Sequence, residues 1–211
     1  PTAPVKTGYS FGGWFTVAGG GGTEFTASTE VAGDITVHAK WTADTYAITY
    51  DANGATGGTI PDAQTKTHGI ELTLAINTGG LVRTGYSYSG WKTLEDGLRT
   101  DYAAGTSYTV NVADTLYATW IANSDTAYTV EHWQQNVGDD EYTKVTGDTQ
   151  HLEGTTGALV DAIAKTYTGF SENTVIPDRV AGGTIIGDGT LVLKLYYDRA
   201  TFTVSFEENG G

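Results

Sequence analysis

The feature that most constrains this chain is an internal repeat. The phrase KTGYSFGGW at residues 6–14 returns as RTGYSYSGW at residues 83–91, with six of nine letters identical. A second phrase, DITVHAKW at residues 34–41, is answered by ADTLYATW at residues 113–120. Because both phrases recur in the same order with nearly the same spacing, the sequence predicts a tandem array of small units.

A third phrase sets the phase of the array. TYAITYDANG at residues 45–54 is echoed by AYTVEHWQQN at 127–136 and by TFTVSFEENG at 201–210. The sequence therefore divides into parts, listed here in chain order: the second half of a unit at 1–42, a complete unit at 44–121, a diverged unit at 126–199 and the first strand of a further unit at 200–211.

Each unit carries strand patterns at both ends. Tyr46, Ile48 and Tyr50 alternate with smaller residues before Asn53-Gly54, which is typical of a half-buried strand followed by a tight turn. The same alternation occurs at 35–41, 116–120 and 191–195, where the units close. Twenty-nine glycines and abundant threonine and tyrosine also favour strands and turns. We expect a β-rich α+β fold.

The middle of each unit is less regular. In the stretch TGALVDAIAKT at 156–166, Leu159 and Ile163 lie four residues apart, which predicts a short amphipathic helix capped by Thr155 or Thr156. The expected unit is therefore a mixed sheet with one short helix or loop crossover.

The repeated aromatic residues are predicted to be a core-packing signature. A unit of this size has a thin core, and each large aromatic ring buries about 150–250 Å². The alternative is an aromatic platform for binding carbohydrate. The signature comprises Tyr9, Phe11, Trp14, Trp41, Tyr86, Tyr88, Trp91 and Trp120.

Trp133 stands apart from that signature because it lies in the polar phrase EHWQQN. We take Trp133, with Tyr142 nearby in the sequence, as the candidate ligand contacts.

The charge balance excludes two classes of partner. Twenty-five acidic and 11 basic residues give a formal charge of −14, and no block of lysine or arginine is present. Nucleic acid and anionic membrane surfaces both require such blocks. No apolar run approaches the ~18 residues of a membrane span, so membrane insertion is not expected.

No pattern in the sequence points to catalysis, a cofactor or a metal ion. Cysteine is absent, which removes disulfides, thiolate ligands and cysteine nucleophiles. Asp139, Asp140 and Glu141 form an acidic turn without the alternating ligands of an EF-hand, so a solvated loop is favoured over a calcium site. The four histidines, which lack the spacing of a metal site, are His38, His68, His132 and His151.

The quoted phrases resemble the Listeria–Bacteroides repeat of bacterial surface proteins, the type found in internalins. The resemblance covers residues 1–121, and the unit at 126–199 looks more like a mucin-binding-protein (MucBP-like) relative of the same repeat. It implies ubiquitin-like β-grasp units, extracellular display at the cell surface or cell wall, and a non-catalytic role as stalk and adhesive module. The expected partner is a protein or glycan of a host or neighbouring cell. Some surface domains of this kind carry Lys–Asn isopeptide bonds, for which Lys40 and Lys194 with nearby Asn or Asp residues are the candidates.

The phase of the array adds a hypothesis of self-association. Residues 201–211, with Phe202, Val204 and Phe206 as candidate strand donors, would complete the half-unit 1–42 of another molecule. Such head-to-tail contacts build filaments when they do not close. The alternatives are a trimmed segment of a longer array and a carbohydrate- or mucin-binding module.

Overall fold

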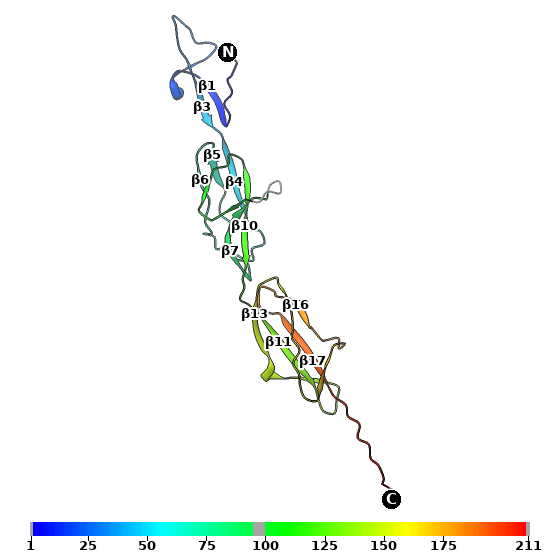
Figure 1. Ribbon diagram of the computed structural model, residues 1–211. Coiled ribbons are helices and arrows are strands. Elements are labelled where there is room, and N and C mark those ends of the chain that lie inside the picture. The colour runs from blue at the N-terminus through cyan, green and yellow to red at the C-terminus, as the bar shows by residue number, and fades with distance from the viewer. Residues whose placement is uncertain (1, 95–99, 210–211) are drawn as a thin grey trace. The chain divides into compact units, whose positions relative to one another are not determined.

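The computed structural model describes residues 2–94 and 100–209, which divide into two compact units (Figure 1). Unit 1 comprises Pro1–Val82 and Tyr88–Trp120, and unit 2 comprises Arg83–Ser87 and Ile121–Gly211. The described residues form strands, turns and two single-turn 3₁₀ helices, η1 (Ala18–Gly20) and η3 (Thr146–Asp148). The expected β-rich architecture is therefore confirmed, and the fold is all-β.

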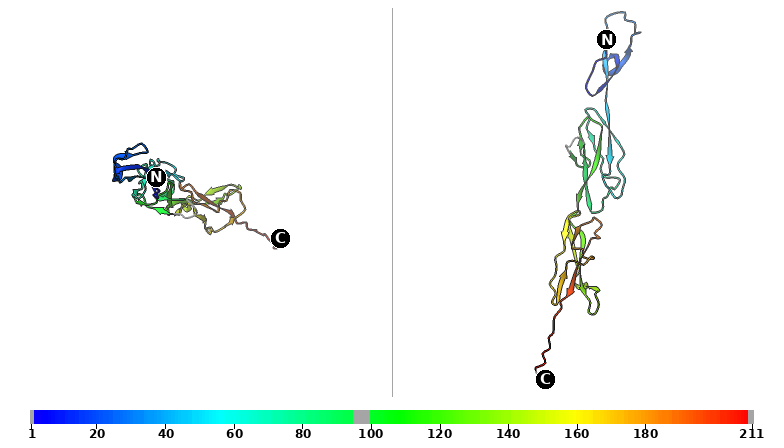
Figure 2. Two further views of the ribbon diagram at one scale, coloured as in Figure 1. Left: turned by 90° about the horizontal axis from the view of Figure 1, so that it is seen from above. Right: turned by 90° about the vertical axis from the view of Figure 1, so that its right-hand side faces the viewer.

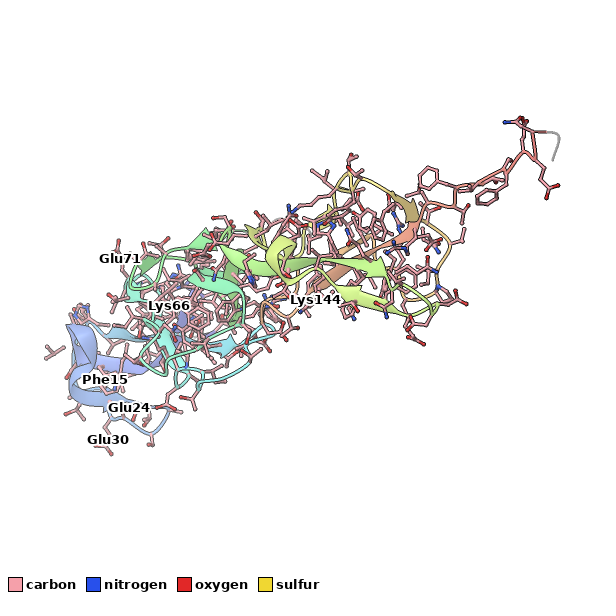
Figure 3. The ribbon with its side chains drawn as sticks, turned by 90° about the horizontal axis from the view of Figure 1, so that it is seen from below. Phe15, Glu24, Glu30, Lys66, Glu71 and Lys144 are labelled. Carbon is pink, nitrogen blue, oxygen red and sulfur yellow. The ribbon has the colours of Figure 1, made fainter. Side chains whose placement is uncertain are left out.

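Unit 1 begins with a three-stranded antiparallel sheet in the order β2-β1-β3, where Phe15 and Glu24 face each other across β1 and β2 (Figure 3). The strands are β1 (Tyr9–Val17), β2 (Gly21–Phe25) and β3 (His38–Ala43). β3 is an edge strand of this sheet.

The larger sheet of unit 1 is mixed and has the order β5-β4-β10-β7-β8. In chain order, β4 is the first strand of this sheet and β10 is the last. The two pair in parallel, with Leu116 opposite Tyr50. The larger sheet comprises β4 (Thr45–Asp51), β5 (Gln64–Thr67), β7 (Tyr86–Lys92), β8 (Asp101–Tyr102) and β10 (Asp114–Ala122), and a separate two-stranded ladder joins β6 (Leu72–Thr73) to β9 (Ser107–Tyr108).

The core of unit 1 lies on one face of this sheet. Ile48, Trp91 and Leu116 are completely buried. The ring of Tyr50 lies 4.5 Å from that of Trp91, whose Nε1–H donates to the Ala75 carbonyl at 2.8 Å. Loop backbone is thereby hydrogen-bonded to the sheet's largest buried side chain.

Unit 2 repeats the same central arrangement. Its sheet has the order β12-β11-β17-β15, with β13 also pairing with β11, and β11 runs parallel to β17. A two-stranded ladder joins β14 to β16. The strands are β11 (Thr126–Gln135), β12 (Tyr142–Lys144), β13 (Gln150–Gly154), β14 (Leu159–Asp161), β15 (Phe170–Asn173), β16 (Gly182–Thr184) and β17 (Val192–Arg199).

The helix predicted over residues 156–166 is wrong. Leu159 belongs to β14, and the backbone after Asp161 has no regular structure up to residue 167. Leu159 and Ile163, which would have formed the apolar face of the helix, are 82% and 81% exposed. A short helix depends on burying such a face, whereas this segment gains backbone hydrogen bonds from β16.

The segment after β17 is extended. Residues 201–209 pair with no strand among the described residues, and they trail away from the sheet of unit 2 in each view (Figures 1 and 2). Phe202, Val204 and Phe206 are 82%, 72% and 90% exposed. The predicted strand donors therefore have no neighbouring strand in the isolated chain.

The exposure of Ile163 leads to a stability prediction. Replacing Ile163 with glutamine should change the free energy of unfolding by less than about 0.5 kcal/mol, because the side chain is exposed. Replacing the buried Ile185 of the same unit with alanine should cost about 2–5 kcal/mol. Urea unfolding followed by circular dichroism measures both. A large loss for Ile163→Gln would mean that this side chain packs into a core.

Candidate functional site

The sheet of unit 2 has two chemically different faces. Along β11, Val130 and His132 point into the core, so Glu131 and Trp133 lie on the opposite face. Along β17, Leu193, Leu195 and Tyr197 are buried in the core, which places Lys194, Tyr196 and Asp198 on the other face. We call this second surface the aromatic face; it comprises Glu131, Trp133, Tyr142, Lys144, Lys194 and Tyr196.

Strand register brings the three aromatic residues of this face together. Trp133 pairs with Tyr196 across the parallel ladder, and their rings stack at 6.0 Å with an interplanar angle of 21°. Tyr142 meets Tyr196 edge-on at 5.1 Å. Tyr196 is 6% exposed, whereas Trp133 and Tyr142 are half-buried. The rings of Trp133 and Tyr142 are therefore partly exposed, and both contact the buried ring of Tyr196.

Charged groups surround Trp133. Its Nε1–H donates to Glu131 Oε2 at 3.2 Å, and the other oxygen of Glu131 pairs with Lys144 Nζ at 3.0 Å. Lys194 Nζ lies 5.9 Å from the Trp133 ring centroid. Figure 3 labels Lys144 in this unit. The indole is thus held in place by hydrogen bonding while one carboxylate and two ammonium groups lie beside it.

Tyr142 is fixed by a second polar group of contacts. Its hydroxyl donates to Asp198, and Asn173 Nδ2 donates to both oxygens of the same carboxylate at 3.0 Å. Burial, and then the hydrogen bond to Asp198, raise the pKa of Tyr142. Burial also raises the pKa of Tyr196. Both phenols therefore remain neutral at physiological pH.

This arrangement suits recognition of an amphipathic ligand. Aromatic rings present an apolar surface, and the neighbouring carboxylate, ammonium and amide groups supply donors and acceptors that fix orientation. Trp133 and Tyr142 of this face were predicted from the sequence as ligand contacts. Tyr196, Lys144, Lys194 and Glu131 were not predicted in that role. The alternation in LVLKLYYDR separates Lys194 and Tyr196 from the buried leucines and was the signal available in the sequence.

The residues of the core signature occupy equivalent positions in the two copies of the phrase. Phe11 meets Trp14 and Trp41 edge-on at 5.4 and 5.7 Å. Tyr88 meets Trp91 and Trp120 in the same way at 5.6 and 5.8 Å. Trp91 is completely buried and the other members of the signature are half-buried, among them Tyr9 and Tyr86.

The lysines proposed for isopeptide bonds lie against aromatic rings. Lys40 Nζ is 5.2 Å from the Phe15 ring centroid, and Lys194 lies over Trp133. A lysine–asparagine contact occurs elsewhere in unit 1, where the buried Lys66, labelled in Figure 3, donates to Asn111 Oδ1 at 2.7 Å.

The acidic turn Asp139–Glu141 is exposed and closed by its own hydrogen bond, from Glu141 N–H to Asp139 Oδ1 at 3.0 Å. Among the described residues, no three histidine, aspartate or glutamate side chains gather in a way that would hold a metal ion. In the same part of the chain, no helix is long and apolar enough to span a membrane.

His132 belongs to a polar network inside unit 2. It is fully buried, its Nδ1 lies 2.9 Å from the Tyr197 hydroxyl, and its buried Nε2 has no hydrogen-bond partner among the described residues. The Tyr197 hydroxyl accepts the Lys165 N–H, and Lys165 Nζ pairs with Asp148 at 2.8 Å. Burial, with a smaller contribution from Lys165, lowers the pKa of His132, while Asp148 opposes the shift.

The fold defines the class of protein: a tandem array of small, mixed β-sheet repeats. The model of the Listeria–Bacteroides repeat domain matches residues 1–40 and 46–119. This chain belongs to that family.

The relatives of this chain among curated proteins include two membrane proteins and an internalin. A Gly-rich membrane protein of Evansella cellulosilytica is 26% identical over 214 residues, which covers 98% of this chain and 24% of the relative. A second membrane protein of that organism is 31% identical over 59% of this chain and 19% of the relative. Internalin H of Listeria monocytogenes is 33% identical over 59% of this chain and 21% of internalin H. The chain thus spans about a quarter or less of their lengths.

The lowered pKa of His132 predicts how the stability of unit 2 depends on pH. The unfolded chain binds a proton at this residue below about pH 6.5, whereas the folded chain resists protonation to a lower pH. The contribution of His132 to stability is therefore fully present above about pH 6.5 and declines as pH falls toward the lowered folded pKa.

Urea midpoints for unit 2 between pH 8 and pH 5 test this dependence. The His132→Gln variant should lose less stability than the wild type as pH falls, because the titrating group is removed. His151→Gln, at an exposed position of the same unit, should behave like the wild type. Equal pH profiles for all three proteins would contradict the assignment.

Proposed function

We propose that this chain is a non-catalytic repeat segment of a secreted bacterial cell-surface protein. It acts as a spacer and as an adhesive module, displayed outside the cell. The support is its family and the relatives whose names describe membrane proteins and an internalin. Several ionisable groups with shifted pKa values also lie in structural networks, such as Tyr142 with Asp198 and Asp148 with Lys165.

The fold assignment within this proposal is a β-grasp-like repeat. The supporting observation is a mixed sheet in which the first and last strands of the unit run parallel side by side, β4 with β10 and β11 with β17. Irregular loops and short two-stranded ladders cross the core face in place of a helix.

The aromatic face of unit 2 is the proposed adhesive surface, and a glycan is the ligand class that it favours. The partly exposed rings of Trp133 and Tyr142 match the apolar C–H face of a sugar. Glu131 and Lys144 match its hydroxyl groups as acceptor and donor. The mucin-binding resemblance of residues 126–199 points to the same ligand class.

Glycan binding is tested by titrating the chain with mucin and with a panel of mucin-type oligosaccharides by calorimetry. Trp133→Ala should weaken binding by about 2 kcal/mol, roughly thirtyfold, because a central aromatic anchor is removed. Lys144→Ala, a milder change, should also weaken binding, and circular dichroism checks that both variants fold. Phe206→Ala, an exposed aromatic outside the face, is the matched control. Binding that survives in Trp133→Ala would place the ligand elsewhere.

Self-assembly by strand complementation is a second candidate function, carried by one specific observation. β3 is an edge strand next to β1, whereas its counterpart β10, the last strand of the next repeat, lies between β4 and β7. Residues 201–207 of another molecule carry the first-strand pattern and fit beside β3 in the parallel sense that β4 adopts beside β10. In a longer chain that carries its own first strand for the repeat at 1–42, that strand would occupy the edge of β3.

Light scattering across a wide concentration range tests this second candidate. Complementation predicts a mass that grows with concentration, and the variant Val204→Asp should remain monomeric because a charge enters the apolar side of the added strand. Val137→Asp, at a position 79% exposed in unit 2, should assemble like the wild type. A steady mass near 22.3 kDa in the wild type would contradict complementation.

A further inference from the structure

The phrase T-G-Y-S, which occurs twice, and its variant T-G-F-S form the same turn in this chain. In the first two copies, Tyr9 N–H donates to the Lys6 carbonyl at 3.0 Å and Tyr86 N–H to the Arg83 carbonyl at 2.9 Å. The third copy reads T-G-F-S, and Phe170 N–H donates to the Tyr167 carbonyl at 3.2 Å.

The glycine of each turn has the same backbone conformation. The φ angles of Gly8, Gly85 and Gly169 are +75°, +79° and +77°. L-residues with a side chain adopt this region at a cost, so the turn itself calls for glycine in all three copies. Any difference between the three positions must therefore come from their surroundings.

Each turn binds the residue that follows the closing strand of its repeat. Asp44, Asn123 and Ala200 donate their N–H groups to the carbonyls of the three turn glycines at 3.0, 2.9 and 2.8 Å. In two copies a serine adds a side-chain bond: Ser10 Oγ donates to Asp44 Oδ1 at 2.7 Å, and Ser87 Oγ to Asn123 Oδ1 at 2.8 Å. Ala200 has no side chain that would accept such a bond.

A third segment completes the first two copies. His68 N–H donates to the Asp44 carbonyl at 2.9 Å within unit 1, and Thr156 N–H donates to the Asn123 carbonyl at 2.9 Å within unit 2. Both donors precede a glycine with positive φ in a turn of the next repeat, at 67–69 and at 155–157. Residues Arg83–Ser87 accordingly group with unit 2, although the phrase belongs in sequence to the repeat at 44–121.

These segments cover the turn glycines. A Cβ atom added to Gly8 would lie 2.0 Å from His68 Cε1, and one added to Gly85 would lie 2.3 Å from Gly187 Cα and 2.7 Å from Thr156 Oγ1. A Cβ added to Gly169 meets nothing within 4 Å. The third turn thus has the same backbone and the same linker bond, but its glycine is uncovered.

We propose that the T-G-Y/F-S turn and its linker residue form a docking surface for the following repeat, and that Gly169, Ser171 and Ala200 form a third surface of the same kind. Its occupant is the glycine turn of another copy of this repeat, of the kind at 67–69 and 155–157. In the first two copies, the docked turn and the surface belong to the same chain. The turn that docks at Gly169 accordingly lies in the same chain, in the repeat whose first strand has the pattern of residues 201–207.

The three glycines provide a test with an internal control. Because their φ angles agree, replacing each with alanine imposes the same backbone strain. Only two of the substitutions also clash with a covering segment: Gly8→Ala with the His68 imidazole, and Gly85→Ala with Gly187 Cα and Thr156 Oγ1. Urea unfolding should show a clearly larger fall in midpoint for these two than for Gly169→Ala. Hydrogen exchange should locate the loosening at residues 67–69 for Gly8→Ala and at 155–157 for Gly85→Ala. Equal falls in all three variants would overturn the proposal.

A chain with an added repeat tests the third surface directly. Residues 201–211 are replaced by a second copy of residues 45–122, and Gly169→Ala is introduced into this longer chain and into the present one. The substitution should lower the urea midpoint of the longer chain as strongly as Gly85→Ala does, and hydrogen exchange should show that the added glycine turn loses protection. An effect of Gly169→Ala that is the same in both chains would overturn the assignment.

Discussion

The parallel pairing of the first and last strands of a repeat is the contact on which the rest of each unit depends. In unit 1 it places Tyr50 of β4 opposite Leu116 of β10, and in unit 2 it places Val130 opposite Leu193. These residues line the cores, and the other strands of each main sheet add to either side of the central pair. Because the paired strands lie more than 60 residues apart in sequence, a unit closes only when its whole length is present.

The repeated aromatic phrase serves two structural purposes in one short stretch. Its second half supplies rings for the core, as Tyr88 and Trp91 do in the larger sheet. Its first half forms a turn whose glycine carbonyl accepts a hydrogen bond from the N–H of the linker residue. The same letters therefore specify packing within one repeat and a contact with the next, which explains why the phrase varies so little between copies. In the diverged unit, Trp133, Tyr142 and Tyr196 lie on the outer face of the sheet, whereas Tyr197 is buried in the core.

The sequence was sufficient for the repeat, its family and the strands, because alternating residues such as Tyr46, Ile48 and Tyr50 report which side of a strand is buried. It was insufficient for residues 156–166, since the spacing of Leu159 and Ile163 fits a helix equally well when both are exposed. For the candidate site, Trp133 was identified from its polar neighbours. Its contact with Tyr196 depends on the register of a parallel pair 63 residues apart, which no local pattern encodes.

Native-state hydrogen exchange, resolved by residue, tests the central claim most directly. If the parallel pair organises each unit, the slowest amides of unit 1 will lie in β4 and β10, and those of unit 2 in β11 and β17, because their exchange requires the whole unit to open. The peripheral ladders, β6 with β9 and β14 with β16, should exchange earlier. Slowest exchange in those ladders, or protection of β4 without β10, would contradict the account.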